Sequence, residues 1–170
     1  MIPVLRIVGP PGSGKTLLIV SLVEALRSRG HRVATVAPRR GGATLIVLTN
    51  GGRVTMDRAL PSEEIARAVT SIDPSAQIVL AEDYDAPADA ALPAIAITAR
   101  GAPPRPGALA TVASEDIEAT FARHGPGDGG PGETNGLVDL VEQRILGLPP
   151  HITAPKPRGW RALVARLRRR

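Results

Sequence analysis

Short apolar runs alternate with segments of good helix formers along most of this chain. Residues 4–8 are mainly apolar, residues 16–29 favour a helix that ends at Gly30, and residues 32–36 are again apolar. Glycine is common just past the end of a helix, so Gly30 marks the helix C-terminus. Two strands joined by one helix within about 35 residues form a βαβ unit with parallel strands and a right-handed crossover. The pattern predicts a parallel sheet with both faces covered.

The same alternation continues to residue 148. Strands at 43–48 and 53–57 flank the turn residues 50–52 and predict a hairpin. A helix opens at 61–64, with Ser62 as its N-cap, and ends near residue 71 before Asp73 and Pro74. The remaining elements are strands at 77–81 and 94–98, helices at 114–123 and 137–148, and a glycine-rich loop at 125–136. We therefore expect one α/β domain.

Composition is consistent with a single domain and excludes several kinds of chemistry. The chain has 170 residues, 2% aromatic residues and no cysteine. Its core must therefore be aliphatic, and disulfides, thiolate metal sites and cysteine nucleophiles are excluded. The apolar start at residues 2–8 is too short for a signal sequence, and no apolar stretch approaches the roughly 18 residues of a spanning helix. We expect a cytoplasmic protein.

Positive charge is concentrated at the C-terminal end. The net charge is +5, and no acidic residue follows Glu142. The basic residues beyond it are Arg144, Lys156, Arg158, Arg161, Arg166, Arg168, Arg169 and Arg170. Because the rest of the chain is slightly acidic, we do not expect the folded body to bind nucleic acid. We divide the chain into a folded domain (1–148), a proline-rich linker (149–158) and a basic amphipathic helix (159–170).

A glycine-rich loop between the first strand and the first helix carries the clearest chemistry. It matches the pattern G-x-x-x-x-G-K-[ST] with Gly9, Pro10, Pro11, Gly12, Ser13, Gly14, Lys15 and Thr16. Glycines let backbone N–H groups converge on phosphate oxygens, and the positive end of the helix dipole favours the same anion. Lys15 would reach the β- and γ-phosphates, and Thr16 would bind Mg²⁺. The loop predicts nucleoside triphosphate binding in a P-loop NTPase-like three-layer sandwich, with a mostly parallel sheet flanked by helices.

Two carboxylates follow the apolar strand 77–81. Glu82 and Asp83 stand at its C-terminal end, where parallel sheets gather ligand-binding groups. A carboxylate at such a position commonly supports the Mg²⁺ ion of a P-loop site. We expect Glu82 or Asp83 to serve the metal together with Thr16, and the sequence leaves open which of the two does so.

With these residues placed, the chain resembles the molybdopterin-guanine dinucleotide biosynthesis protein B (MobB) family of small P-loop proteins. The resemblance covers about residues 2–148. Its four segments are 7–16 with the loop, 29–36 with the second strand, 42–47, and 78–84 followed by 93–100. This chain departs from the family after the second strand, where residues 37–41 pass directly to Gly42 and Ala43 without the family's longer polar segment.

The resemblance implies a GTP-binding homodimer that assists a molybdenum cofactor nucleotidyltransferase. Guanine selection rests on the resemblance alone, so ATP stays open as the nucleotide. The polar residues near the predicted strand 77–81 are Gln77, Glu82 and Asp83, and none of them is an obvious catalytic base. We therefore expect a weak GTPase at most. The alternative is a P-loop kinase or ATP-dependent ligase that acts on a small molecule.

The end of the chain has an amphipathic pattern of its own. Trp160, Leu163, Val164 and Leu167 fall at i, i+3, i+4 and i+7, with arginines between them. Three roles stay open for this helix: binding an anionic membrane, binding an acidic partner or nucleic acid, or packing on its own domain.

Overall fold

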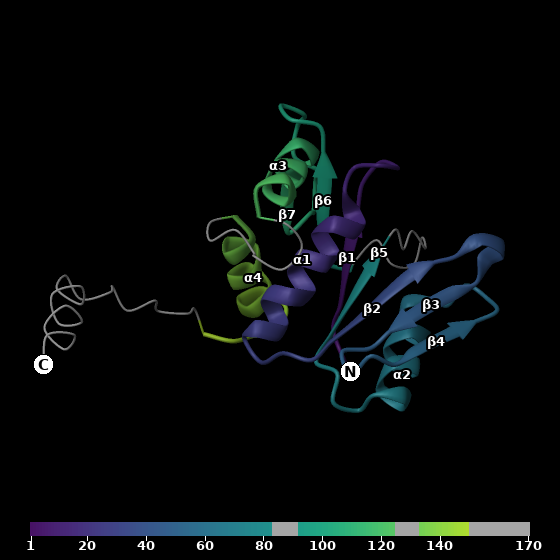
Figure 1. Cartoon of the computed structure of the whole chain (residues 1–170). Coiled ribbons are helices and arrows are strands. Elements are labelled where there is room, and N and C mark those ends of the chain that lie inside the picture. Colours follow the sequence, from purple (N-terminus) through teal and green to yellow (C-terminus); the bar gives the residue numbers. More distant parts are fainter. Residues whose placement is uncertain (83–91, 125–132, 150–170) are drawn as a thin grey trace, which may run out of the picture.

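The computed structural model describes residues 1–82, 92–124 and 133–149, in which one seven-stranded sheet forms the centre (Figure 1). The strand order is β4-β3-β2-β5-β1-β6-β7. The strands are β1 (Val4–Val8), β2 (Val33–Pro38), β3 (Thr44–Val47), β4 (Arg53–Met56), β5 (Ile78–Glu82), β6 (Ala94–Thr98) and β7 (Ala110–Ala113). The neighbouring strands β2, β5, β1, β6 and β7 pair in parallel. The hairpin formed by β3 and β4 is antiparallel, and β3 pairs with β2 in antiparallel orientation. The predicted mostly parallel sheet is confirmed.

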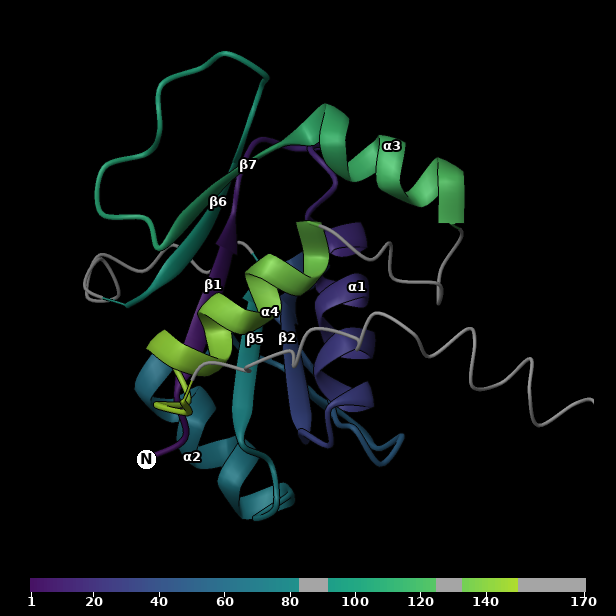
Figure 2. The ribbon, with the colours of Figure 1, turned by 90° about the vertical axis from the view of Figure 1, so that its left-hand side faces the viewer.

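Helices cover both faces of this sheet. One face carries α1 (Lys15–Ser28), α3 (Ser114–His124) and α4 (Glu133–Arg144), and Figures 1 and 2 show α4 beside α1. The opposite face of the β2–β5 region carries α2 (Ser62–Ile72). Side chains alternate between the faces, so Leu5 and Ile7 face α1 whereas Val4 packs on the side of α2. This arrangement is the expected three-layer α/β sandwich.

Three expectations about individual elements need correction. The predicted N-cap Ser62 is the first residue of α2, and Pro61 is the N-cap. The closing helix lies four residues earlier than predicted, because Glu133–Arg144 is helical and the chain turns at Gly147 with a positive φ of 66°. The glycine-rich loop is therefore shorter than 125–136. The strand β7 was not predicted; its four residues are half-buried and it is held by its pairing with β6.

Several expectations fall outside the described residues. These are Asp83, the greater part of the loop 85–93, residues 125–132, and the tail beyond residue 149. Among the described helices, none is long and apolar enough to cross a membrane.

Candidate functional site

The glycine-rich motif of residues 9–16 forms the connection between β1 and α1. β1 ends at Val8 and α1 begins at Lys15, directly after Gly14, which has a positive φ of 87°. Among the described residues no side chain caps this helix, and its first turn contains no acidic residue. The N–H groups of the first turn and the helix dipole therefore face the loop, an arrangement that suits an anion.

Close packing explains two glycines of the motif. A Cβ atom at Gly9 would lie 2.8 Å from the Ser13 Oγ and 3.0 Å from the Ile97 carbonyl oxygen, closer than side chains approach. At Gly14, a Cβ atom would lie 3.2 Å from the Ile117 Cγ2, and the positive φ adds backbone strain. Both positions keep the loop close to β6 and α3, so glycine serves packing here as well as phosphate approach.

The lysine of the motif is folded over its own loop. Its Nζ donates to the carbonyl oxygens of Gly9 at 3.0 Å and Pro10 at 2.7 Å, and the residue is only 6% exposed. The ammonium group is therefore held as a localised positive charge above the loop. This position is where a lysine would meet the oxygens of a bound polyphosphate.

A threonine–carboxylate pair completes the site. The Thr16 Oγ1 donates to the Glu82 Oε1 at 2.9 Å. Their proximity comes from the sheet, since the pairing of Ile7 with Glu82 brings the end of β5 next to the end of β1. Hydroxyl and carboxylate oxygens are the ligands that Mg²⁺ prefers. The pair therefore fits a magnesium ion that also binds phosphate oxygens.

The structure brings together most of the expected site. All eight residues of the motif and Glu82 lie at the C-terminal edge of the parallel strands, whereas Asp83 is outside the described part. Gln77 lies at the opposite edge, where its side chain accepts from the backbone N–H of Arg32 at 2.9 Å. Gln77 therefore lies away from the glycine-rich loop. Arg100 follows β6 at the same edge as the loop and forms an ion pair with Asp116 of α3.

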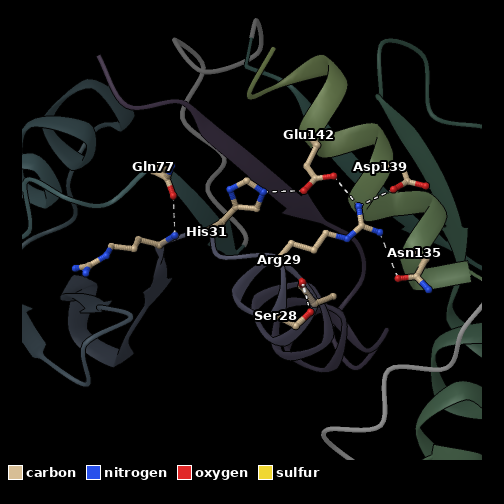
Figure 3. A network of polar contacts seen from close by, with 9 residues as sticks. Ser28, Arg29, His31, Gln77, Asn135, Asp139 and Glu142 are labelled. Carbon is tan, nitrogen blue, oxygen red and sulfur yellow. Dashed lines mark hydrogen bonds and ion pairs between the residues drawn. The ribbon is translucent and has the colours of Figure 1, made fainter. Parts of the chain in front are cut away.

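A buried ionic network links α1 to α4 and had no clear sequence signal (Figure 3). Arg29 donates to Glu142 and to Asp139, both at 2.6 Å, and the His31 Nε2 lies 2.7 Å from the second carboxylate oxygen of Glu142. Burial disfavours the charged guanidinium, but these hydrogen bonds outweigh it and raise the pKa of Arg29. Glu142 is 1% exposed, so its charge depends on these partners.

An apolar groove lies on the other side of α1 and was also not predicted. It has a volume of about 390 Å³ between α1, β2 and β3, and one end contains Thr16 and Glu82. Apolar periodicity could not reveal this groove, because the same pattern describes a strand face whether or not a helix covers it.

Comparisons with known proteins give a limited likeness. No protein-family model matches this chain, and no curated protein matches it. Seven chains of solved structures match, and three MobB proteins or homologues are among them. A MobB protein homologue from Bacillus stearothermophilus is 21% identical, with a TM-score of 0.45, over 71% of this chain and 96% of that chain. Bacillus subtilis MobB is 14% identical, with a TM-score of 0.47, over 72% and 97%. A molybdopterin-guanine biosynthesis protein B is 21% identical, with a TM-score of 0.41, over 68% and 92%.

Proposed function

We propose that this chain is a GTP-binding adaptor in molybdenum cofactor biosynthesis. The observation that carries its nucleotide chemistry is the pair of Thr16 and Glu82, 2.9 Å apart beside the open N-terminus of α1. Residues 9–16 would hold the triphosphate, with Lys15 on the β- and γ-phosphates. Thr16 and Glu82 would hold Mg²⁺, which neutralises charge on the same oxygens. Asp83 stays a second candidate for the metal.

We propose an adaptor, rather than an enzyme with rapid hydrolysis, because of the polar groups that surround the proposed phosphate site. Hydrolysis needs a group that orients and activates water beside the γ-phosphate. Glu82 is bonded to the loop through Thr16, from which it accepts, and Asp116 at the start of α3 is paired with Arg100. Gln77 lies at the far edge of the sheet with Arg32. We infer weak hydrolysis or none.

The place in molybdenum cofactor biosynthesis is supported by the order of the sequence segments that resemble the MobB family. A cytoplasmic location is a separate proposal, which rests on the absence of cysteine. The resemblance further implies GTP as the nucleotide, a molybdenum cofactor nucleotidyltransferase as the partner, and a homodimer. None of these depends on the basic tail, because the four resembling segments lie within residues 2–100.

A competition titration tests the nucleotide. We expect the full-length protein to bind a fluorescent GTP analogue in the presence of Mg²⁺, and unlabelled GTP to displace it better than ATP. A strong preference for ATP, without competition by GTP, would overturn the adaptor proposal and favour a kinase or an ATP-dependent ligase. Rapid phosphate release without any partner would also overturn the adaptor role.

A further inference from the structure

Among the described residues, no helix covers the apolar groove beside α1. Its wall follows α1 from Thr16 to Arg27, and its floor is formed by β2 and β3. Val20, Leu45 and Val47 line it, are half-buried, and belong to none of the core clusters. These side chains thus present an aliphatic surface that the described residues leave partly open to water, which is unfavourable unless something covers it.

The short connection between β2 and β3 explains the opening. Only residues 39–43 join the two strands. Residues 40–42 form a short 3-10 turn, and the backbone N–H of Arg39 donates to the carbonyl oxygen of Ala43. Among the described helices, α4 packs on the other side of α1 and α2 covers the opposite face of the sheet. The described helices therefore leave the outer side of the groove uncovered, and the apolar side of one further helix could lie there along α1.

The chain itself supplies a segment of matching length beyond the described residues. Residues 159–170 would span about 18 Å as a helix, and the groove wall from Thr16 to Arg27 spans about 17 Å. The apolar stripe of the tail is formed by Trp160, Leu163, Val164 and Leu167. A helix of this length is marginal in water by itself, so it needs a surface to pack on.

The end of the described chain lies close enough to the groove. The backbone N–H of Leu148 bonds to the carbonyl of Glu142, whose side chain bonds to Arg29 at the C-terminus of α1. The nine residues 150–158 contain prolines and reach about 28 Å when extended. A helix is about 10–12 Å wide, so this linker can pass around the end of α1 to the groove.

Charge also favours this occupant. The groove carries Glu24 and Glu82 against the single Arg27, whereas the tail from residue 159 onward has five arginines and no acidic residue. Opposite charges at the rim would orient the helix and slow its release.

We propose that residues 159–170 dock as a helix in the groove between α1 and the β2–β3 hairpin. Its apolar stripe covers Val20, Leu45 and Val47. This completes the helical layer on that face of the sheet, and the tail then lies against Thr16 and Glu82 at the end of the groove. The docking does not depend on which nucleotide the protein binds.

Tryptophan fluorescence of the full-length protein tests the docking, because Trp160 is the only tryptophan of the chain. We expect emission shifted to the blue of the denatured protein, and a shift back to the red in Val20→Glu and Leu45→Glu. The matched control is Ile72→Glu, the same kind of change at a 38% exposed position on α2; its emission should equal that of the unchanged protein. Circular dichroism checks that each variant is folded.

A second variant protects the test against misfolding of the groove variants. Leu163→Glu changes only the tail, and docking predicts the same red shift with an unchanged melting temperature of the domain. Native emission equal to that of the denatured protein would overturn the proposal, as would groove variants that leave the emission unchanged. A blue shift that disappears on dilution would assign the groove to the tail of a second copy. A blue shift seen only with anionic phosphatidylserine vesicles would assign the tail to a membrane; both results overturn docking within one chain.

Discussion

The two edges of the sheet, where β1, β2, β5 and β6 end and where they begin, differ in how their polar groups are held. At the first edge, polar groups belong to the glycine-rich loop or lie beside it. At the second edge, polar side chains are bonded to one another. The first edge holds Lys15 above loop carbonyls and leaves the first turn of α1 without a side-chain cap among the described residues. The second holds Arg29, His31 and Glu142 in a closed network. One helix, α1, has an end at each edge.

This difference separates binding from stability. Groups that must receive a ligand are kept in place by backbone geometry, so their removal should affect affinity more than folding. Groups that satisfy one another in a buried position stabilise the fold, and the loss of one leaves its partner desolvated and unpaired. Variants at the first edge should therefore lower nucleotide affinity with little change in melting temperature. Variants at the second edge should lower the melting temperature with little change in affinity.

The largest effect is expected for Glu142→Ala. This change removes a carboxylate that is 1% exposed and leaves Arg29 without its most buried partner. Because the Arg29 side chain keeps some access to water, we expect a loss of about 3 kcal/mol of unfolding free energy, measured by urea denaturation. Nucleotide affinity should stay unchanged in the folded protein. The matched control is Asp139→Ala, which removes the exposed partner of the same guanidinium and should cost less than about 1 kcal/mol.

Lys15→Ala should produce the reverse pattern. Loss of charge-assisted bonds to two phosphates should weaken triphosphate binding by about 100-fold, while the melting temperature changes little. Isothermal titration with GTP and Mg²⁺ measures the affinity. Arg67→Ala, which removes an exposed cation on α2, should leave it unchanged. Equal affinities of the Lys15→Ala and unchanged proteins would contradict the assignment of the site.

Glu82→Gln should have a smaller and metal-specific effect. The amide still accepts from Thr16 but has no charge to offer Mg²⁺, so binding with Mg²⁺ should fall by about tenfold and binding with EDTA should hardly change. Glu63→Gln on α2 controls for the change of net charge. Equal losses with and without metal would make Glu82 a structural partner of Thr16 only.

The smallest effect concerns the acid stability of the strand-starting edge. Asp73 ends α2, and hydrogen bonds from the side chain and backbone of Ser75 lower the pKa of this carboxyl below its ordinary value. The folded state therefore releases the proton more readily than the unfolded state, and this stabilisation is lost as pH falls through the folded pKa. Asp73→Asn should lose less stability than the unchanged protein between about pH 5 and about pH 2. Thermal melting at several pH values measures these losses. Equal losses of stability in the two proteins over this range would refute the role given to Asp73.

Local patterns were enough to predict the βαβ unit and six of the other elements, β3, β4, α2, β5, β6 and α3. β1 and β2 are short runs of mostly buried residues, and α1 between them is a run of good helix formers that ends at a glycine, so the signal for these elements was strong. The signal was weak for β7, because residues 110–113 are half-buried and the strand is held by pairing with β6. The predicted bounds of the last helix, 137–148, were four residues too late, because the first residues of α4 resemble a loop in composition. Packing of Val138 and Val141 on α1 favours the helix there.

The sequence by itself determined the glycine-rich loop between β1 and α1, because its glycines, lysine and threonine lie within eight consecutive residues and the pattern is local. Only the tertiary structure decided what those residues meet. Thr16 bonds to Glu82 across 66 positions of the chain, and Arg29 bonds to Glu142 across 113. Pairing of β1 with β5 creates the first contact, and packing of α4 on α1 creates the second. Such contacts depend on how the strands and helices are ordered in space, which no window of neighbouring residues encodes.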